Sequence, residues 1–249
     1  MRLGKQPAKN DPRTLRLAKY LPASLPAAPR AADWTAKVTV WGSMMNDIIG
    51  DCVFAGGGHA VQTWTAYEGI ERVPSDMQVQ GYYESWAGYD PSSPATDQGY
   101  VELDFLNKWR KLGYCGAILD GYADPDWHNA EHVKISIALF GGIYIGVQLP
   151  QSAMDQFSAG QPWTMTGDRR VVGGHALWVP AYDRDWLYAV TWGKKQPMAW
   201  DCLAAWCDEA HTLRSPLFLN AYGVSASSIK LDNWDADLAL LDVETKPLT

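Results

Sequence analysis

One cysteine of this 249-residue sequence stands at the predicted start of a helix. Cys52 follows Gly50 and Asp51, and apolar residues recur at helical spacing from Val53 to Tyr67. The unpaired N–H groups at a helix N-terminus stabilise a thiolate, which is the form of cysteine that attacks a carbonyl carbon. A lone cysteine is most often a small buried hydrophobic residue, but this position favours Cys52 as a nucleophile. Asp51 stands where an N-cap belongs, so we expect its carboxylate to point away from the thiol.

Two histidines compete as the base for this nucleophile. His59 lies seven residues further along the same predicted helix, roughly 10 Å away along the axis. That separation is too long for a hydrogen bond, so we expect His59 to be a core residue. His175 follows two glycines at the start of a predicted strand, where its side chain can face a cleft. It is therefore the better candidate for the base.

The predicted elements change character along the chain. Helical patterns fill the first half, over residues 52–67, 75–86, 101–112 and 129–140. Strand patterns follow over 143–149, 176–182 and 186–191, and a further helix is predicted over 199–207 with Asp208 and Glu209 at its end. This segregation indicates an α+β fold with two lobes. The run Gly56-Gly57-Gly58 inside the first helix is costly by propensity, which predicts that other groups pack very close to it.

The N-terminal residues form a basic arm. The first 30 residues contain seven Lys or Arg and one acid, a charge of +6, against −13 for the remainder. We expect residues 1–33 to be extended, because prolines interrupt them and few large apolar residues are available to bury. As a propeptide the arm would cross the cleft and block Cys52, whereas as an anchor it would leave the cleft open and reach a partner; its shortness favours the anchor. Residues 34–249 are expected to form one domain, with a helical lobe over about 34–135, a strand-rich lobe over about 136–225 and a C-terminal tail.

The remaining features exclude several classes of protein. The net charge of −7 argues against a nucleic-acid-binding body. No apolar run reaches transmembrane length and no secretory leader is present, which predicts synthesis in the cytoplasm and no membrane partner. The spacing of the four cysteines matches no zinc site or disulfide scaffold, so we expect no disulfide; they are Cys52, Cys115, Cys202 and Cys207. His128 and His132 could ligate a metal ion, but no third ligand is apparent, and neither a metal nor another cofactor is expected.

Several short segments together resemble the papain-like cysteine peptidases. They follow one another in the family's order over about residues 33–200, and the resemblance implies the two-lobed papain-like fold, with a helical lobe and a strand-rich lobe. The matching segments are Asp33-Trp34, Gly50-Asp51-Cys52, Asp97-Gln98-Gly99, Phe140-Gly141-Gly142, Gly174-His175-Ala176, Ala181-Tyr182 and Thr191-Trp192-Gly193.

The resemblance also implies roles for individual residues. Cys52 would attack a carbonyl carbon, and His175 would pair with the thiolate and then protonate the leaving group. Asn46 stands where the family has the glutamine of the oxyanion hole, on a stem one carbon shorter. Val190 stands where the family has the asparagine that orients the histidine, so Thr191 could accept from the imidazole instead if the strand shifts by one residue. Trp192, in the family's Trp-Gly segment, would shield the pair from water.

The function implied is a cysteine peptidase, or a related amide hydrolase, that acts on a peptide or protein substrate. The stretch Asn46-Asp47-Ile48-Ile49-Gly50-Asp51-Cys52 and the basic leader also resemble uncharacterised papain-like proteins of tailed phages and prophages. That second resemblance implies phage structural proteins as partners of the arm and incorporation into a virion. The alternatives are a catalytically weak or inactive structural or interaction protein of a phage particle, and a transglutaminase or amidase with the same Cys-His pair.

Overall fold

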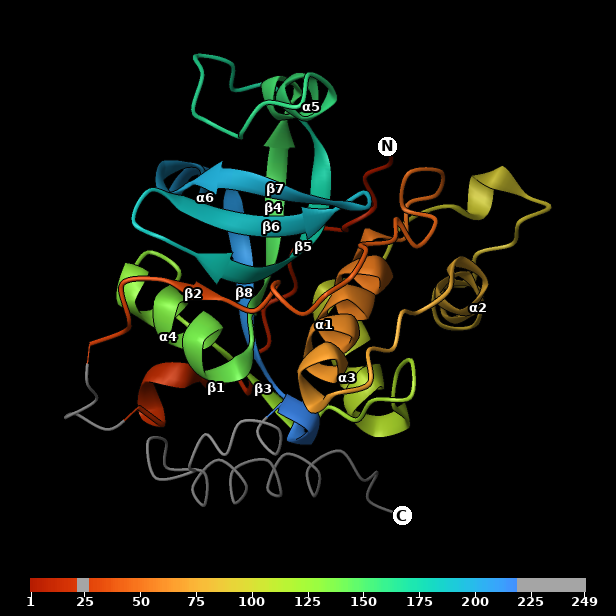
Figure 1. Ribbon diagram of the computed structural model, residues 1–249. Helices are drawn as coiled ribbons and strands as arrows, with labels where there is room; N and C mark the ends of the chain where they lie inside the picture. Colours follow the sequence, from red (N-terminus) through yellow and green to blue (C-terminus); the bar gives the residue numbers. More distant parts are fainter. Residues whose placement is uncertain (22–26, 219–249) are drawn as a thin grey trace.

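The computed structural model of the protein describes residues 1–21 and 27–218 (Figure 1). The C-terminal tail expected from the sequence lies outside these residues. Helices and strands segregate into a helical lobe and a strand-rich lobe, as the sequence predicts, and each lobe has its own large cluster of buried hydrophobic residues.

The helical lobe is built around one almost completely buried helix. It contains α1 (Cys52–Glu68), α2 (Asp76–Ala87), the 3-10 helix η2 (Pro94–Thr96) and α3 (Glu102–Leu112). All residues of α1 from Cys52 to Ala66 are buried. The helix ends at Gly69, which adopts the left-handed conformation that glycine accommodates without strain.

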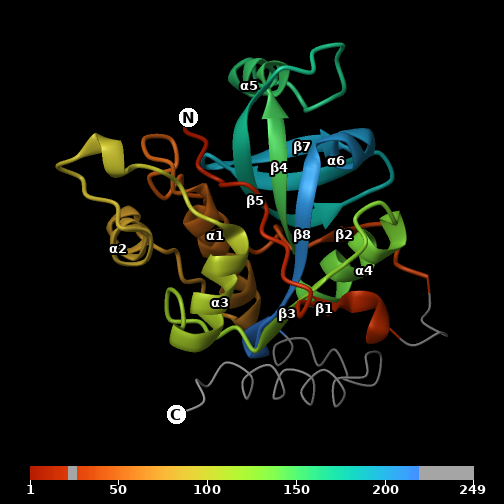
Figure 2. The ribbon, with the colours of Figure 1, turned by 180° about the vertical axis from the view of Figure 1, so that it is seen from behind.

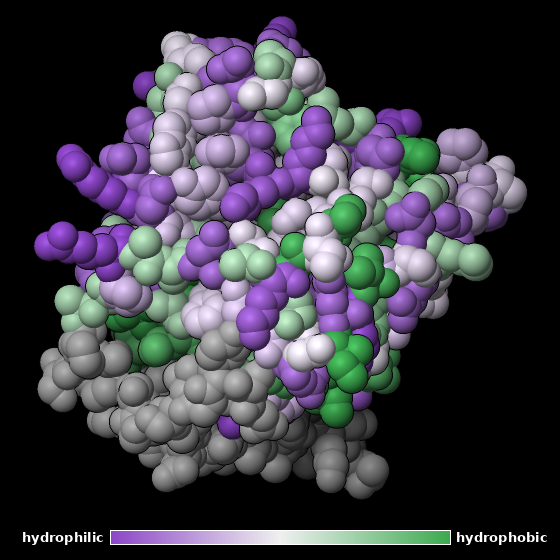
Figure 3. Space-filling view, viewed as in Figure 1, coloured by the Kyte–Doolittle hydropathy of each residue, from purple (hydrophilic) through white to green (hydrophobic). Residues whose placement is uncertain are grey.

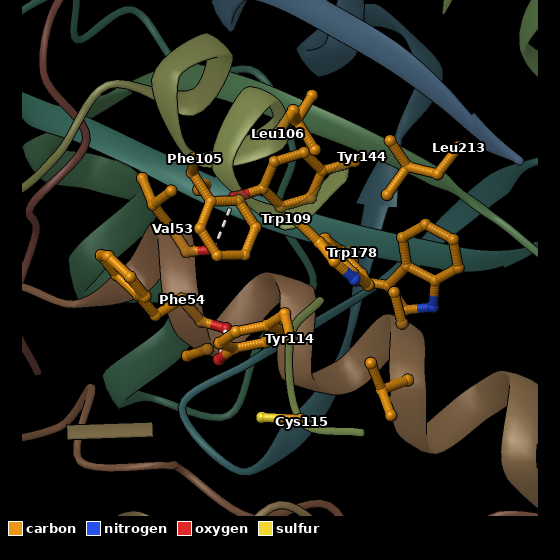
Figure 4. Packing of buried hydrophobic residues seen from close by; sticks show 14 of the residues in the cluster. Val53, Phe54, Phe105, Leu106, Trp109, Tyr114, Cys115, Tyr144, Trp178 and Leu213 are labelled. Atoms are coloured by element: carbon orange, nitrogen blue, oxygen red, sulfur yellow. Dashed lines mark hydrogen bonds between the residues drawn. The ribbon is translucent and has the colours of Figure 1, made fainter. Parts of the chain in front are cut away.

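The glycine run in α1 makes room for large side chains, as the sequence predicts. A Cβ atom on Gly56 would lie 2.7 Å from the Tyr144 ring, and one on Gly57 would lie 2.5 Å from the Phe105 ring. Figure 4 shows these rings packed over the first turns of the helix. The Tyr144 hydroxyl donates to the Val53 carbonyl at 2.7 Å. Since Tyr144 belongs to the strand-rich lobe, this contact fixes the start of α1 against that lobe.

The strand-rich lobe contains one mostly antiparallel sheet in the order β1-β3-β8-β4-β5-β6-β7, with β2 pairing β5 off this path. Only the β1–β3 pairing among these is parallel. Helices α4, α5 and α6 pack against it. The strands are β1 (Leu15–Arg16), β2 (Ala32–Asp33), β3 (Gly121–Asp124), β4 (Ile143–Pro150), β5 (Val171–Tyr182), β6 (Trp186–Thr191), β7 (Lys194–Ala199) and β8 (Cys207–Arg214). The helices are α4 (Ala130–Phe140), α5 (Gln151–Ser158) and α6 (Trp200–Trp206).

Two acidic residues lie on a strand and not at a helix end, which corrects the sequence prediction. Helix α6 ends at Trp206 because Cys207 adopts extended dihedral angles, φ −69° and ψ 134°. Asp208 and Glu209 therefore belong to β8, and Glu209 is paired with Gly146 of the central strand β4. The local sequence pattern does not predict this pairing, because Gly146 precedes Glu209 by about sixty residues in the chain.

The basic arm lies against the body and has no core of its own, as expected. Its 3-10 helix η1 (Leu17–Lys19) contributes Leu17 to a small buried cluster with Tyr20, Ala123 and Phe140. Residues 2–6, which we name the N-terminal strap, run between the two lobes. Figure 2 shows this part of the chain, in red, passing between α1 and the strands β4, β5 and β8. The expectation that an arm of this length leaves the space between the lobes open is wrong.

The surface carries several exposed hydrophobic side chains. Figure 3 shows hydrophobic residues gathered in front of α1, whereas polar residues dominate over the strand-rich lobe. Val40 and Ile70 are among the exposed hydrophobic residues, at 70% and 81% exposure. Among the described residues no helix is both long and apolar enough to cross a membrane.

Candidate active site

The thiol of Cys52 lies at the N-terminus of α1, where the lobes meet. Cys52 is the first residue of the helix and is 1% exposed. Its Sγ atom accepts a hydrogen bond from the backbone N–H of Ala176 on β5, at 3.4 Å. The loop before Cys52 is held by the residue that follows η2, because the Gly50 N–H donates to the Asp97 carboxylate at 2.9 Å. The nucleophile predicted from the sequence therefore stands beside the residue that follows His175.

His175 is held by one ring nitrogen. Its Nε2 atom and the Thr191 hydroxyl oxygen lie 2.7 Å apart, and the ring stacks on the Trp192 indole. The other ring nitrogen, Nδ1, is buried and has no hydrogen-bond partner in the part of the chain that the structure describes. A neutral imidazole that donates through Nε2 keeps the lone pair of Nδ1 free to accept a proton. Nδ1 is thus the ring nitrogen that has no partner among the described residues, on the residue before the one whose N–H meets Cys52 Sγ.

A bulge in β5 explains why Thr191 and not Val190 meets the histidine. Trp178 pairs with Val190, but Ala181 pairs with Tyr188, so the register shifts by one residue between them. Opposed residues of an antiparallel pair point to the same side of the sheet, and a one-residue shift exchanges the two faces. Beyond the bulge, Thr191 therefore lies on the face of His175, and Val190 lies on the opposite face.

Burial keeps the candidate pair uncharged in this form of the protein. Desolvation raises the pKa of the Cys52 thiol to about 12, and the N–H groups of Ala176 and Gly4 lower it only in part. Desolvation also lowers the pKa of His175 to about 3. A reactive cysteine needs the opposite shifts, which give a thiolate beside an imidazolium. Burial in the form that the structure shows therefore disfavours this ion pair.

Asp51 is buried, in contrast to its predicted role as a helix cap. Its side chain makes no capping hydrogen bond, and neither carboxylate oxygen has a well-directed partner among the described residues. Desolvation raises the pKa of Asp51 well above its usual value, and the nearby Asn46 amide offsets this only in part. Burial is the larger cause of the raised pKa of the Cys52 thiol, and a charge on Asp51 raises that pKa further.

The Asn46 side chain lies in the tight loop before α1 and is 2% exposed. Its Nδ2 atom donates to the Ile49 carbonyl at 3.3 Å. The preceding residues Met44 and Met45 both have positive φ angles, 53° and 70°, which curl the loop inward. The amide is thus engaged within its own loop, and the proposed donation of Asn46 to an oxyanion requires it to turn away from Ile49.

The N-terminal strap pairs with the helical lobe as an added strand would. Gly4 and Gln6 both bond to Tyr100: the Tyr100 N–H donates to the Gly4 carbonyl at 2.8 Å, and the Gln6 N–H donates to the Tyr100 carbonyl at 2.9 Å. The Arg2 N–H donates to the Asn46 carbonyl at 3.0 Å. These bonds hold the strap across the loop that leads to the nucleophile.

The strap pairs equally with the strand-rich lobe. The Lys5 N–H donates to the Gly174 carbonyl at 3.1 Å, next to His175, and the Trp192 indole N–H donates to the Arg2 carbonyl at 3.2 Å. A Cβ atom on Gly4 would clash with the Gly50 carbonyl oxygen. A glycine at position 4 thus lets the strap pass directly over the start of α1, which removes solvent from the candidate pair.

The sequence gave no indication of a charged cluster at the strap. Lys5 meets the carboxylates of Asp208 and Glu209, and Glu102 and His211 lie beside them. These residues come from three distant parts of the chain, so no local spacing joins them. At most, the opposite net charges of the basic arm and the rest of the chain indicated that the two attract each other.

The other candidates lie outside the site. His59 is buried in α1, as expected, with Nε2 2.9 Å from the Gly42 carbonyl oxygen. His128 is exposed, and the Nδ1 atom of His132 accepts from the Asp126 N–H at 3.3 Å. All four cysteines are free thiols, and Cys202 belongs to α6 while Cys207 begins β8.

Comparison with known proteins establishes the fold. No protein-family model matches the chain, and no curated protein matches its sequence. Among solved structures, it is similar to xylellain, a cysteine protease from Xylella fastidiosa, with a TM-score of 0.65 and 16% identity over 85% of this chain and 95% of that one. A structure from work on the mite allergens Blo t 1 and Der p 1 matches with a TM-score of 0.47 and 13% identity, over 86% of this chain and 75% of that one. The chain has the two-lobed papain-like cysteine-protease fold.

Proposed function

We propose that the protein is a latent cysteine peptidase with Cys52 as nucleophile and His175 as base. The observation that carries the proposal is the hydrogen bond between His175 Nε2 and the Thr191 hydroxyl, which leaves Nδ1 without a partner. That bond fixes the ring while the Ala176 N–H, one residue further along β5, fixes the sulfur. The xylellain likeness supports the same class of chemistry.

The reaction follows from these positions once the strap has left. The Cys52 proton passes to His175 Nδ1, and the thiolate attacks the carbonyl carbon of a peptide bond. The backbone N–H of Cys52 and the Asn46 amide donate to the oxyanion. His175 then gives its proton to the leaving amine as the C–N bond breaks, and water hydrolyses the remaining thioester to release the acid and the thiol.

The strap is the cause of latency in this proposal. It occupies the backbone positions at Tyr100 and Gly174 where an extended substrate would pair, and it excludes water from the thiol. Water entering after its departure reverses the desolvation that suppresses the thiolate. Residues 7–10 just beyond the strap are exposed, which makes them accessible to a cutting protease.

Cutting the folded chain behind the strap tests the proposal. A recognition sequence for a site-specific protease, inserted between Ala8 and Lys9, allows the full chain to fold before it is cut. After removal of the released peptide by gel filtration, we expect hydrolysis of an unfolded protein at least about tenfold faster than by the uncut chain. The matched Cys52→Ala chain should show no hydrolysis after the same cut. A cut chain that labels at Cys52 with a thiol-reactive epoxide but hydrolyses no peptide would overturn the proposal.

The second candidate is a papain-fold protein that acts without catalysis. The complete burial of both Cys52 and His175 favours it, because the shifts in their pKa values suppress the ion pair. In this case the strap is a permanent part of the fold, and the basic arm contacts phage structural proteins of a virion. The same experiment separates the two, since a permanent strap stays bound after the cut and Cys52 stays unlabelled. A transglutaminase or amidase would instead label at Cys52 and turn over a non-peptide amide.

A further inference from the structure

The side chain of Lys5 is completely buried between the lobes. Its Nζ atom lies 2.9 Å from Asp208 Oδ1 and 2.8 Å from Glu209 Oε1, and the Lys5 side chain is 0% exposed. Lysine is almost never fully buried unless it is paired with acids. Burial alone lowers the pKa of Lys5, but the charges of Glu102 and Glu209 outweigh it and raise the pKa above the usual value. The amine is held as a cation.

A glycine makes room for the stem of this lysine. A Cβ atom on Gly146 of β4 would clash with Cε of Lys5 and would lie 2.7 Å from Cγ of Glu209. No residue larger than glycine therefore fits at position 146 while the lysine stem is in place. The missing side chain at position 146 thus leaves space on the sheet for the aliphatic stem of Lys5, whose amine lies among carboxylates.

Residues of the strand-rich lobe, and not the strap, position the two carboxylates that meet the lysine amine, those of Asp208 and Glu209. The Gln148 amide donates to Asp208 Oδ2 at 2.6 Å. His211 Nε2 lies 3.5 Å from Glu209 Oε2, and His211 Nδ1 is bonded to Asp124 Oδ1 at 2.8 Å. We therefore expect the Asp208 and Glu209 carboxylates to keep their places when the strap leaves.

Departure of the strap then leaves three acids, Glu102, Asp208 and Glu209, with the cation of His211 beside them but without that of Lys5. Glu102 is fully buried, and neither of its oxygens has a hydrogen-bond partner in the described residues. Its pKa is raised well above the usual value by desolvation and by the charge of Glu209. Since buried charges without a partner are very unfavourable, departure of Lys5 leaves a pocket that binds another cation.

The pocket opens directly beside the candidate active site. The backbone N–H of Lys5 bonds to the Gly174 carbonyl, next to His175, and the preceding Gly4 lies against Cys52. A side chain in the pocket therefore belongs to a residue adjacent to the one that lies over Cys52.

We propose that the pocket of Glu102, Asp208 and Glu209, filled by Lys5 in the latent chain, selects a lysine side chain of the peptide substrate. This inference rests on the proposed peptidase function and names its substrate class. The strap then occupies the site as a substrate would. Its Lys5 fills the lysine-recognition pocket, and removal of the strap leaves that pocket free for a substrate.

A divalent cation is the other occupant that the acids could hold. Ligand atoms of Glu102, Glu209 and His211 lie within 4.8 Å of one another. However, His211 is bonded to Asp124, and although burial lowers its pKa, the hydrogen bonds with Asp124 and Glu209 raise it to about 10. A protonated imidazole has no lone pair for a metal, and the space at Gly146 fits an aliphatic stem. Both points favour lysine.

The test uses the cut chain and pairs of peptides that differ only in charge. Peptides with lysine or the neutral isostere norleucine at the selected position are compared by kcat/KM. We expect a preference for lysine of at least about 100-fold, because norleucine leaves the buried acids unpaired. Glu209→Gln should reduce this ratio at least about tenfold, whereas the control Asp104→Asn, an exposed acid that pairs with Lys9, should leave it unchanged.

A binding measurement separates failure of this inference from failure of the proposed function. The cut Cys52→Ala chain should bind a synthetic peptide of residues 1–8, and the same peptide with norleucine for Lys5 should bind at least about 100-fold more weakly. If the cut chain hydrolyses both substrates at the same rate and binds both peptides with the same affinity, the pocket does not select lysine, although the protein is a peptidase. If the cut chain binds the lysine peptide selectively but hydrolyses neither substrate, the proposed peptidase function is wrong, although the pocket selects lysine. Displacement of the peptide by zinc ions, reversed by a chelator, would assign the acids to a metal and overturn the inference.

Discussion

The ring of His175 lies flat against the indole of Trp192, with ring centroids 4.3 Å apart and planes inclined by 17°. Trp192 adopts a positive φ of 44°, which is uncommon for a bulky residue and turns the chain sharply after β6. Its indole N–H reaches the strap at the Arg2 carbonyl. One side chain therefore covers the imidazole face and also contacts the segment that closes the site.

Thr191 should act by orienting His175. Thr191→Val keeps the shape but removes the oxygen that meets Nε2. A buried donor without a partner costs about 1–3 kcal/mol, so we expect the free energy of unfolding to fall by about that amount. In the cut chain we expect kcat to fall roughly tenfold, with KM nearly unchanged, because only the proton transfer is affected. Thr191→Ser retains the hydroxyl and should recover most of kcat; an equal loss in both variants would show that the hydroxyl is not the orienting group.

Lys5 should control access to Cys52 in the uncut chain. Lys5→Met removes the cation that fixes the strap, and we expect epoxide labelling of Cys52 at neutral pH to accelerate at least about tenfold. The control is Lys9→Met, which removes the same charge from an exposed pair with Asp104 and should change the rate less than about twofold. Mapping of the labelled peptides detects unfolding, since the buried Cys115 should stay unlabelled in both chains. Equal rates at Cys52 in both variants would mean that the strap does not depend on Lys5.

Gly146 should tolerate no side chain while the strap is in place. Gly146→Ala forces its Cβ against the Lys5 stem and the Glu209 side chain, so we expect a loss of about 1–3 kcal/mol in urea unfolding. Gly81→Ala is the matched control in α2, where no atom lies within 4 Å of the new Cβ; it should be neutral or stabilising by up to about 1 kcal/mol. Release of the strap by cutting should remove the part of the cost that the Lys5 stem causes and leave the part that the Glu209 side chain causes. A cost that the cut leaves unchanged would show that the Lys5 stem does not fill the space at position 146.

The fold was predictable where a pattern is local. The helix that begins at Cys52 shows its period in the sequence, and the glycine run in it correctly indicated close packing against other rings. Strands β3 and β8 were not predicted, because each is stabilised by a partner distant in sequence, and β3 has only four residues. The fold class followed from the order of these segments.

The site could be predicted only in part, for the same reason. Cys52 stands at the helix start that its pattern predicts, whereas His175 lies inside β5, which begins four residues earlier at Val171 and not at the histidine as predicted. Their catalytic roles stay proposals. The use of Thr191 depends on a bulge between Trp178 and Ala181, which no residue type announces. The burial of Asp51 and the position of Lys5 depend on packing between the lobes, which single-sequence patterns do not contain.

Acid should destabilise the folded protein through its buried histidines. Burial lowers the pKa of His59 from 6.5 to about 4 and that of His175 to about 3. The unfolded chain takes up these protons below pH 6.5 whereas the folded chain does not, so their stabilising contribution is present above 6.5 and is lost as the pH falls toward 4. Each histidine contributes up to about 1.4 kcal/mol per pH unit in this window.

His59 allows this effect to be measured away from the catalytic pair. His59→Gln retains a donor for the Gly42 carbonyl and has no charge to gain. We expect urea unfolding between pH 6.5 and 4 to show a slope that is lower in this variant by up to about 1.4 kcal/mol per pH unit, because one of the two buried imidazoles is gone. The exposed His128→Gln should leave the slope as it is. An unchanged slope in His59→Gln would show that other groups, and not the buried imidazoles, bind the protons that unfold the chain.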